Sequence, residues 1–144
     1  MTAILIGYYD PVRGRLILGQ RAAGSRQPLK DPKLTKIERF LTRWFPCTLL
    51  TGGNRCTYLR RWQLFKWRDH RVFVHHFLKD DWSLDLHDHS SRFVSIGLRG
   101  SYAEHTPVGI KTWTAPWVRT FPAIHRHRVV LVTPTVWTLC YQAP

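Results

Sequence analysis

Two pairs of histidines are the residues of this chain best suited to carry out chemistry. Each pair has one residue between its members: His87 with His89, and His125 with His127. On a β-strand, residues i and i+2 point to the same face, about 7 Å apart along the chain, so each pair could grip one metal ion. If both segments line one barrel, three or four imidazoles converge. Imidazole suits Fe, Zn, Cu or Ni, and three protein ligands leave positions open for chemistry.

Other side chains near these pairs could assist a metal ion. Glu104 would be a further ligand or would accept an imidazole N–H, and the alternative is a solvated strand end. Tyr102 shares its face and could donate a proton or position a substrate; otherwise it is a core tyrosine. His125 is a fourth ligand if its strand is regular, because it then faces the same way as His127. If Pro122 bends the chain, His125 only flanks the mouth of the site.

The elements that position these residues are expected to be mainly strands. Short β-branched or aromatic runs separated by turn residues predict an antiparallel double-sheet sandwich or barrel, and they span residues 57–67, 72–78, 92–98, 129–132 and 136–141. A hairpin is predicted near the N-terminus, with its second strand over 15–18.

One amphipathic helix is expected in the N-terminal half of the chain. Asp31 is the predicted N-cap, and Pro32 takes the first helical position. Apolar side chains recur at helical spacing and are predicted to be buried, namely Leu34, Ile37, Leu41 and Trp44. The lysines and arginines between them are predicted to remain exposed.

The spacing of the first histidine pair resembles that of the cupin superfamily. Its first motif is G-x5-H-x-H-x3,4-E-x6-G, and His87, His89 and Gly100 fit this spacing. Phe93 stands where the motif has glutamate, and Asp81 stands where it has the first glycine.

The second cupin motif, G-x5-P-x-G-x2-H-x3-N, is matched by Pro122 and His127 only. Its two glycines and its asparagine are replaced here by Pro116, Ile124 and Leu131. The segments 58–62, 86–89, 100–106 and 127–129 are also similar to a group of small uncharacterised cupins, many of which occur in phages and bacteria.

The cupin resemblance implies a fold, a ligand set and an activity. The fold would be a jelly-roll barrel, and the metal ligands would be His87, His89 and His127. Without the glutamate, such a three-histidine site is similar to that of the thiol dioxygenases related to cysteine dioxygenase. It would hold Fe(II), with Mn, Ni, Cu or Zn as alternatives, and would act on a small chelating molecule with O2. A metal-dependent isomerase or lyase is a weaker alternative.

Composition and charge bound the remaining possibilities. The 144 residues fit one domain, with a basic hairpin, loop and helix over 1–55 and the barrel over 56–144. With 44% hydrophobic residues, global disorder is excluded. Three cysteines without CxxC spacing argue against a disulfide framework. There is no convincing signal peptide and no apolar run of membrane-spanning length, so a cytoplasmic location is expected.

The basic residues suggest a second kind of function. The net charge of +13 divides into +11 over residues 1–71 and +2 over the rest. The chain could therefore be a catalytically silent cupin scaffold that binds nucleic acid or an acidic protein, and a homodimer is a further possibility. The charge could also be a solubilising face. The candidate polyanion-binding residues are Lys33, Lys36, Arg39, Arg43, Arg60 and Arg61. The aromatics among them, Trp62 and Trp67, are expected to lie largely in the core.

Overall fold

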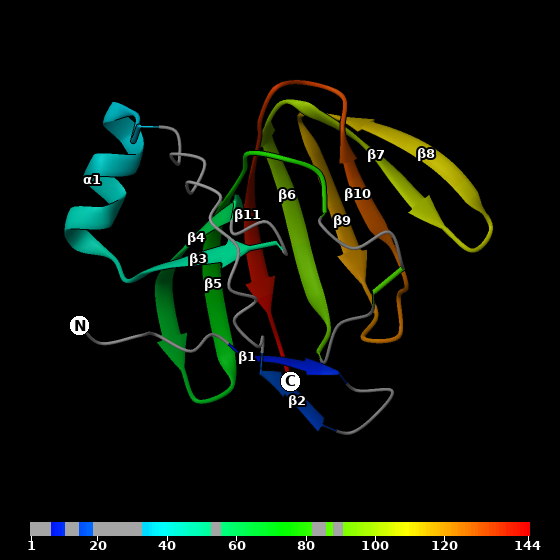
Figure 1. The fold of residues 1–144 in the computed structure, drawn as a ribbon, viewed down its shortest axis with the longest axis horizontal. Helices are drawn as coiled ribbons and strands as arrows, with labels where there is room; N and C mark the ends of the chain where they lie inside the picture. The colour runs from blue at the N-terminus through cyan, green and yellow to red at the C-terminus, as the bar shows by residue number, and fades with distance from the viewer. Residues whose placement is uncertain (1–6, 11–14, 19–32, 53–55, 82–85, 88–90) are drawn as a thin grey trace, which may run out of the picture.

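The computed structural model describes residues 7–10, 15–18, 33–52, 56–81, 86–87 and 91–144 (Figure 1). In chain order the elements are β1 Gly7–Asp10, β2 Arg15–Leu18, α1 Lys36–Trp44, β3 Cys47–Thr51, β4 Thr57–Trp67, β5 His70–Phe77, β6 Phe93–Arg99, β7 Ser101–Thr106, β8 Gly109–Thr114, β9 Trp117–Phe121, β10 Arg128–Leu131 and β11 Val136–Gln142. The prediction of a mainly β chain with one helix is confirmed. No helix in this described part is long and apolar enough to cross a membrane.

Two antiparallel sheets build the barrel. The larger has the strand order β3-β4-β5-β11-β6-β9, and the smaller has the order β10-β7-β8. The core between them is formed by Tyr102, Trp117, Val129 and Val136, which come from both sheets. In Figure 1, α1 lies beside β3 and β4, at the opposite end of the molecule from the β7–β8 hairpin. The predicted double-sheet architecture is confirmed, and the predicted N-terminal hairpin is the β1–β2 pair.

Alternation along the strands assigns each side chain of the large sheet to one of two faces. On β11, Val136, Thr138 and Cys140 are buried and face the small sheet, so we call this the inner face. Adjacent His75 and His76 lie on opposite faces of β5, with His75 on the inner face. The outer face carries His76 and is the one that α1 covers.

A glycine makes the turn that carries the chain from the large sheet into the small one. Gly100 lies between β6 and β7 with φ +92°, a conformation that side chains rarely adopt. A Cβ atom there would lie 2.4 Å from the carbonyl oxygen of Thr135. Next to it, the Ser101 N–H donates to Thr133 Oγ1 at 2.8 Å. Only glycine fits this turn, and β7, which carries Glu104, starts directly after it.

The helix begins with a capping box. The N-cap is Thr35, whose hydroxyl accepts from the Glu38 N–H at 3.2 Å while the Glu38 carboxylate accepts from the Thr35 N–H at 2.7 Å. Asp31 and Pro32 lie outside the described residues, but residues 33–35 are not helical, so the predicted start of the helix at Pro32 is wrong.

The prediction of which helix side chains are buried is wrong for three of four residues. Ile37 is 62% exposed, Trp44 64% and Leu34 37%, while Leu41 is half-buried. The residue that α1 does bury is Glu38, at 0% exposure. The reason is that the outer face beneath the helix carries polar groups, Arg60 and His76, which need a carboxylate partner. The exposure predicted for Lys33, Lys36 and Arg43 is confirmed.

Candidate metal centre

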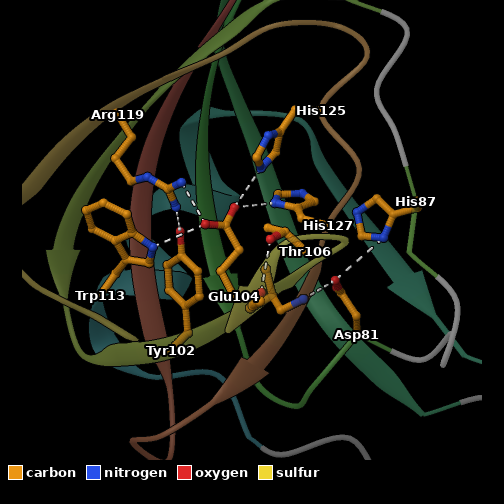
Figure 2. A network of polar contacts seen from close by, with 11 residues as sticks. Asp81, His87, Tyr102, Glu104, Thr106, Trp113, Arg119, His125 and His127 are labelled. Atoms are coloured by element: carbon orange, nitrogen blue, oxygen red, sulfur yellow. Dashed lines mark hydrogen bonds and ion pairs between the residues drawn. The ribbon is translucent and has the colours of Figure 1, made fainter. Parts of the chain in front are cut away.

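Glu104 lies at the centre of a network of donors on the inner side of β7 (Figure 2). Its carboxylate is 2% exposed and accepts four contacts. Oε1 accepts from His125 Nε2 and His127 Nδ1, each at 2.9 Å. Oε2 accepts from Arg119 Nη2 at 2.6 Å and from Trp113 Nε1 at 3.1 Å. The two histidines therefore converge on one oxygen, and the arginine and tryptophan on the other.

These contacts keep the carboxylate charged. Burial by itself would raise the pKa of Glu104, but hydrogen bonds from His127, Arg119 and His125 together hold that pKa well below its usual range. A permanently ionised carboxylate is the form that binds a metal cation.

Strand pairing brings the second histidine motif to Glu104. β10 pairs with β7, with Val129 opposite Glu104, and His127 lies directly before β10. The backbones of His87 and His127 form a closed pair, in which each N–H donates to the other C=O at 2.9 Å. Their ring centroids are 5.0 Å apart. The structure thus places His87 beside His127, but the donor atoms that converge are those of Glu104, His125 and His127, and His89 lies outside the described residues.

The chain bends before His125, which leaves its side chain directed at the cluster. The His125 N–H donates to the Pro122 carbonyl at 3.0 Å, so a turn and not a regular strand precedes the pair. The His125 and His127 rings nevertheless both reach Glu104, with centroids 5.1 Å apart. Of the two expectations for His125, the bend is present and the residue still joins the cluster.

The donor set suits a transition metal. The ligand atoms of Glu104, His125 and His127 all lie within 4.8 Å of one another, the one such group within the described residues. Two histidines with one carboxylate, leaving open positions, is the ligand set typical of non-haem Fe(II) oxygenases. Phe93, which replaces the motif glutamate, stacks on Phe121 at 4.4 Å and forms an apolar wall near His127.

Tyr102 joins this network from the core side. Arg119 Nη1 donates to its hydroxyl at 2.9 Å, and its side chain packs in the core at 5% exposure. Burial raises the pKa of Tyr102 to about 12, so its hydroxyl keeps its proton near neutral pH.

Arg119 and Trp113 are members of the site that sequence reasoning missed. The Arg119 guanidinium lies between the Trp113 ring at 3.8 Å and the Phe121 ring at 4.3 Å. A signal for it exists in β9, where Arg119 alternates with the buried Trp117 and Phe121. An arginine on an inward-facing position requires an internal partner.

One side of the cluster opens to solvent at His125. Its side chain is 25% exposed, against 7% for His127 and 3% for Glu104. Beside it lies a hollow of about 380 Å³, lined by Thr106, Pro107, Val108, Pro122, Ile124, His125 and Arg126. A small molecule could approach the cluster from this side.

The predicted polyanion-binding residues do not share one surface. Lys33, Lys36, Arg39 and Arg43 are exposed along α1. Arg60 is 3% exposed and bound to Glu38 at 2.6 Å, and Arg61 lies on the inner face against His75 at 3.0 Å.

Solved structures share this fold. HppE with Fe(II) has a TM-score of 0.59 and 11% identity over 70% of this chain and 57% of the HppE chain. An RmlC-like cupin from Shewanella frigidimarina has a TM-score of 0.56 and 20% identity over 71% of this chain and 86% of its own. No family model and no curated protein matches. The chain has the cupin jelly-roll fold, as the sequence resemblance predicted.

The fold and the donor cluster point in the same direction. The chain has the jelly-roll fold of the solved cupins, and this barrel brings together three residues that could hold a metal ion, Glu104, His125 and His127.

Proposed function

We propose that this chain is a non-haem Fe(II) cupin, a dioxygenase acting on a small chelating molecule. The observation that carries the proposal is the two-histidine, one-carboxylate cluster of Glu104, His125 and His127. The similarity in fold to HppE, solved with Fe(II), supports the same metal. A bound Fe(II) would hold the chelating substrate and activate O2 at its open positions.

The residues around the cluster have distinct tasks in this proposal. Arg119 and Trp113 hold Glu104 through Oε2, which leaves Oε1 toward the histidines. Glu104 Oε1, His125 Nε2 and His127 Nδ1 would hold the ion, which would take the place of the two hydrogen bonds that now join them.

His87 is a further candidate ligand, because its ring lies beside that of His127. His89, the other member of the predicted three-histidine set, remains a prediction. Tyr102 holds a proton at Oη, close to Arg119, and is the proposed proton donor to an oxygen of the substrate.

Metal analysis of protein purified without a nickel column tests the proposal. We expect near-stoichiometric Fe, or Fe(II) uptake under anaerobic conditions, followed by oxygen consumption with a panel of small chelating molecules. Zn or Mn without oxygen consumption would favour an isomerase or lyase. Absence of any metal uptake would rule out a metal-dependent function.

A second candidate function is binding of single-stranded nucleic acid at the β4–β5 hairpin. Trp67 stacks on His70, and His70 stacks on Tyr141, each with centroids 5.9 Å apart. Arg68 lies 4.9 Å from the Trp67 ring. Trp67 is 56% exposed, so the prediction that it lies in the core is wrong, whereas Trp62 is fully buried. Exposed aromatics with cations stack successive bases.

Titration with a single-stranded oligonucleotide at two salt concentrations tests this candidate. Trp67→Ala should weaken binding by about 1–3 kcal/mol per stacked base. Leu98→Ala is the control, because Leu98 is similarly exposed, on β6, and lies outside the stack. Equal effects of both substitutions, or no binding at low salt, would remove this candidate.

A further inference from the structure

One row of the inner face carries polar side chains that the metal cluster does not use. Strand pairing places Arg61 of β4 opposite His75 of β5, His75 opposite Thr138 of β11, and Thr138 opposite Gly97 of β6. Gly97 in turn is opposite Trp117 of β9. These residues follow one another across five strands, with neighbouring strands about 4.8 Å apart.

Two hydrogen-bonding groups in this row lack partners. Thr138 Oγ1 and Trp117 Nε1 are buried and make no hydrogen bond. The Trp117 indole lies against Gly97, where an added Cβ would come within 2.2 Å of the ring, so the indole extends from β9 over the strand next to Thr138. Unpartnered buried polar atoms are rare in folded proteins and mark places where a ligand or water completes the hydrogen bonding.

Two arginines on the same face are not neutralised by a carboxylate. Arg61 donates from Nε to His75 Nε2 at 3.0 Å and lies 5.0 Å from the Phe73 ring. Arg71 is on β5, two positions before Phe73 and therefore on the same inner face, and its Nε is buried without a partner. Within the part of the chain that the structure describes, neither forms an ion pair with an acidic side chain.

Electrostatics indicates that the two guanidinium groups act on each other. Burial lowers the pKa of Arg61. Cys140 and Tyr58 act to raise this pKa, and the positive charge of Arg71 has a smaller lowering effect. The inner-face carboxylate of Glu104 is already taken by Arg119 and two histidines. Both arginines are half-buried, and a partly desolvated cation is stabilised by an anionic partner. Their surroundings supply donors, which complement an anion.

Arg71 lies four residues before His75 on β5, at the end of the large sheet where the metal cluster is. Pairing places Arg71 opposite Gln142, Gln142 opposite Phe93, and Phe93 opposite Phe121. The Phe121 ring contacts His125 and His127, with centroids 4.9 and 5.5 Å away. The arginines on β4 and β5 and the cluster beside β9 therefore flank a common interior.

We propose that Arg61, Thr138 and Trp117 form an anion subsite inside the barrel, with Arg71 adding positive charge four residues further along β5. The subsite binds the carboxylate or phosphate group of a small molecule whose other end reaches the Glu104 cluster. The site thereby assigns the substrate to the class of small organic acids or phosphate esters. The link to a substrate rests on the proposed metal-dependent function, whereas anion binding itself can be measured without a metal.

The test is calorimetric titration of the full chain with inorganic phosphate and, separately, with acetate, each with and without Fe(II). Tryptophan fluorescence would follow the surroundings of Trp117. We expect one of the two anions to bind, which identifies the acidic group. Arg61→Gln should weaken that binding at least tenfold, and Arg71→Gln should weaken it by less. Arg99→Gln, at an exposed position on β6, is the matched control and should bind as the original chain does.

Two further variants keep the test decisive. Thr138→Val removes one donor with little change of volume and should weaken anion binding several-fold even if an arginine variant fails to fold. Glu104→Gln should remove metal binding and retain anion binding. If the original chain binds an anion but takes up no metal, the metal-dependent function is refuted and the anion subsite stands. Binding of neither anion to the original chain, or equal binding by the Arg61, Arg71, Thr138 and Arg99 variants, would overturn the anion subsite.

Discussion

The molecule contains two buried glutamates that are each paired with an arginine and with histidine. The Glu38 cluster, made of Glu38, Arg60 and His76, lies on the outer face of the large sheet beneath α1. The Glu104 cluster, made of Glu104, Arg119, His125 and His127, lies inside the barrel. Glu38 is 0% exposed and Glu104 is 2% exposed, and each has an arginine nitrogen at 2.6 Å. Their chemical composition is nearly the same.

The difference lies in which oxygen the arginine occupies. In the Glu38 cluster, Arg60 and His76 share Oε1, and Oε2 caps the helix through the Thr35 N–H. The His76 ring is covered by Trp137 at a centroid distance of 4.0 Å. A guanidinium thus stands where a metal ion would need to be.

In the Glu104 cluster the arginine is confined to the other oxygen. Arg119 binds Oε2, so Oε1 faces two imidazoles, and His125 is open to solvent. The comparison teaches that the position of one arginine distinguishes a structural ion pair from the proposed metal-ligand set.

Removing the central carboxylate of each cluster should give the largest contrast. Glu104→Gln should lower Fe(II) affinity at least about 100-fold, because a direct ligand is lost. Glu38→Gln should leave that affinity unchanged. Anaerobic calorimetric titration with Fe(II) measures the affinity of both variants. An equal loss of affinity in the two would contradict the assignment of Glu104 as a ligand.

Glu38→Ala should destabilise the fold by about 3–5 kcal/mol, because Arg60 is left as an uncompensated buried charge. Urea unfolding measures the change. Combining Glu38→Leu with Arg60→Met should recover much of the loss, since a well-packed apolar pair replaces the ion pair. If the double variant is no more stable than Glu38→Ala, charge burial is not the cause.

Acid should weaken the fold through Glu38. Its pKa is lowered from 4.5 to about 2, against the opposing effect of burial, by hydrogen bonds from Thr35, Arg60 and His76. A folded-state pKa below the unfolded one stabilises the protein above about pH 4.5, and this contribution disappears as the pH falls toward 2. Urea unfolding between pH 7 and 2 should show the decline. Glu38→Gln should have a flatter profile, and Glu104, whose pKa is also lowered, contributes to the slope that remains.

Arg119→Lys should lower metal affinity about tenfold, at the low end of what loss of a supporting partner causes. Lysine keeps the charge but cannot reach Tyr102 and Glu104 with two nitrogens, nor stack between two rings. A matched change is Arg60→Lys in the Glu38 cluster, which should affect stability and not metal binding. Unchanged Fe(II) affinity in Arg119→Lys would show that Glu104 needs no positioning.

The smallest effect is expected on the exposed side of α1. Trp44→Ala should change the free energy of unfolding by less than about 0.5 kcal/mol, since the side chain is 64% exposed. Trp62→Ala, beneath the helix at 0% exposure, should cost about 3–5 kcal/mol. Thermal or urea unfolding compares them. A large effect of Trp44→Ala would mean that α1 is held by its apolar side as well as by Glu38.

The helix shows what periodicity can and cannot predict. The apolar spacing correctly indicated a helix that includes Ile37 and Trp44, but it named the wrong face as buried. The direction in which a helix docks depends on the surface that receives it. Here that surface carries Arg60 and His76, whose need for a carboxylate outweighs the burial of apolar area. Strand pairing places Arg60 and His76 next to each other on this surface, and the sequence of the helix gives no information about that pairing.

The site was predictable in part for a similar reason. Two His-X-His pairs are a local pattern, and the meeting of His87 and His127 agrees with it. For Glu104 the sequence left two roles open, a partner of the metal site or a solvated strand end, because the choice depends on which strand pairs with β10. Arg119 was missed, because only the fold brings this β9 residue and Trp113 of β8 within 3.1 Å of the Glu104 carboxylate on β7.

The closed backbone pair between His87 and His127 has a consequence for the order of folding. It joins residues 40 positions apart, so it forms only after a long loop has closed. The conformational entropy lost in closing this loop comes before any stabilisation from the histidine side chains. The complete ligand set is therefore expected to assemble late, when β10 has paired with β7. An ion that binds only the completed barrel adds RT ln(1 + [L]/Kd) to its stability. Metal supply would then act on how long a newly made chain survives, as well as on its chemistry.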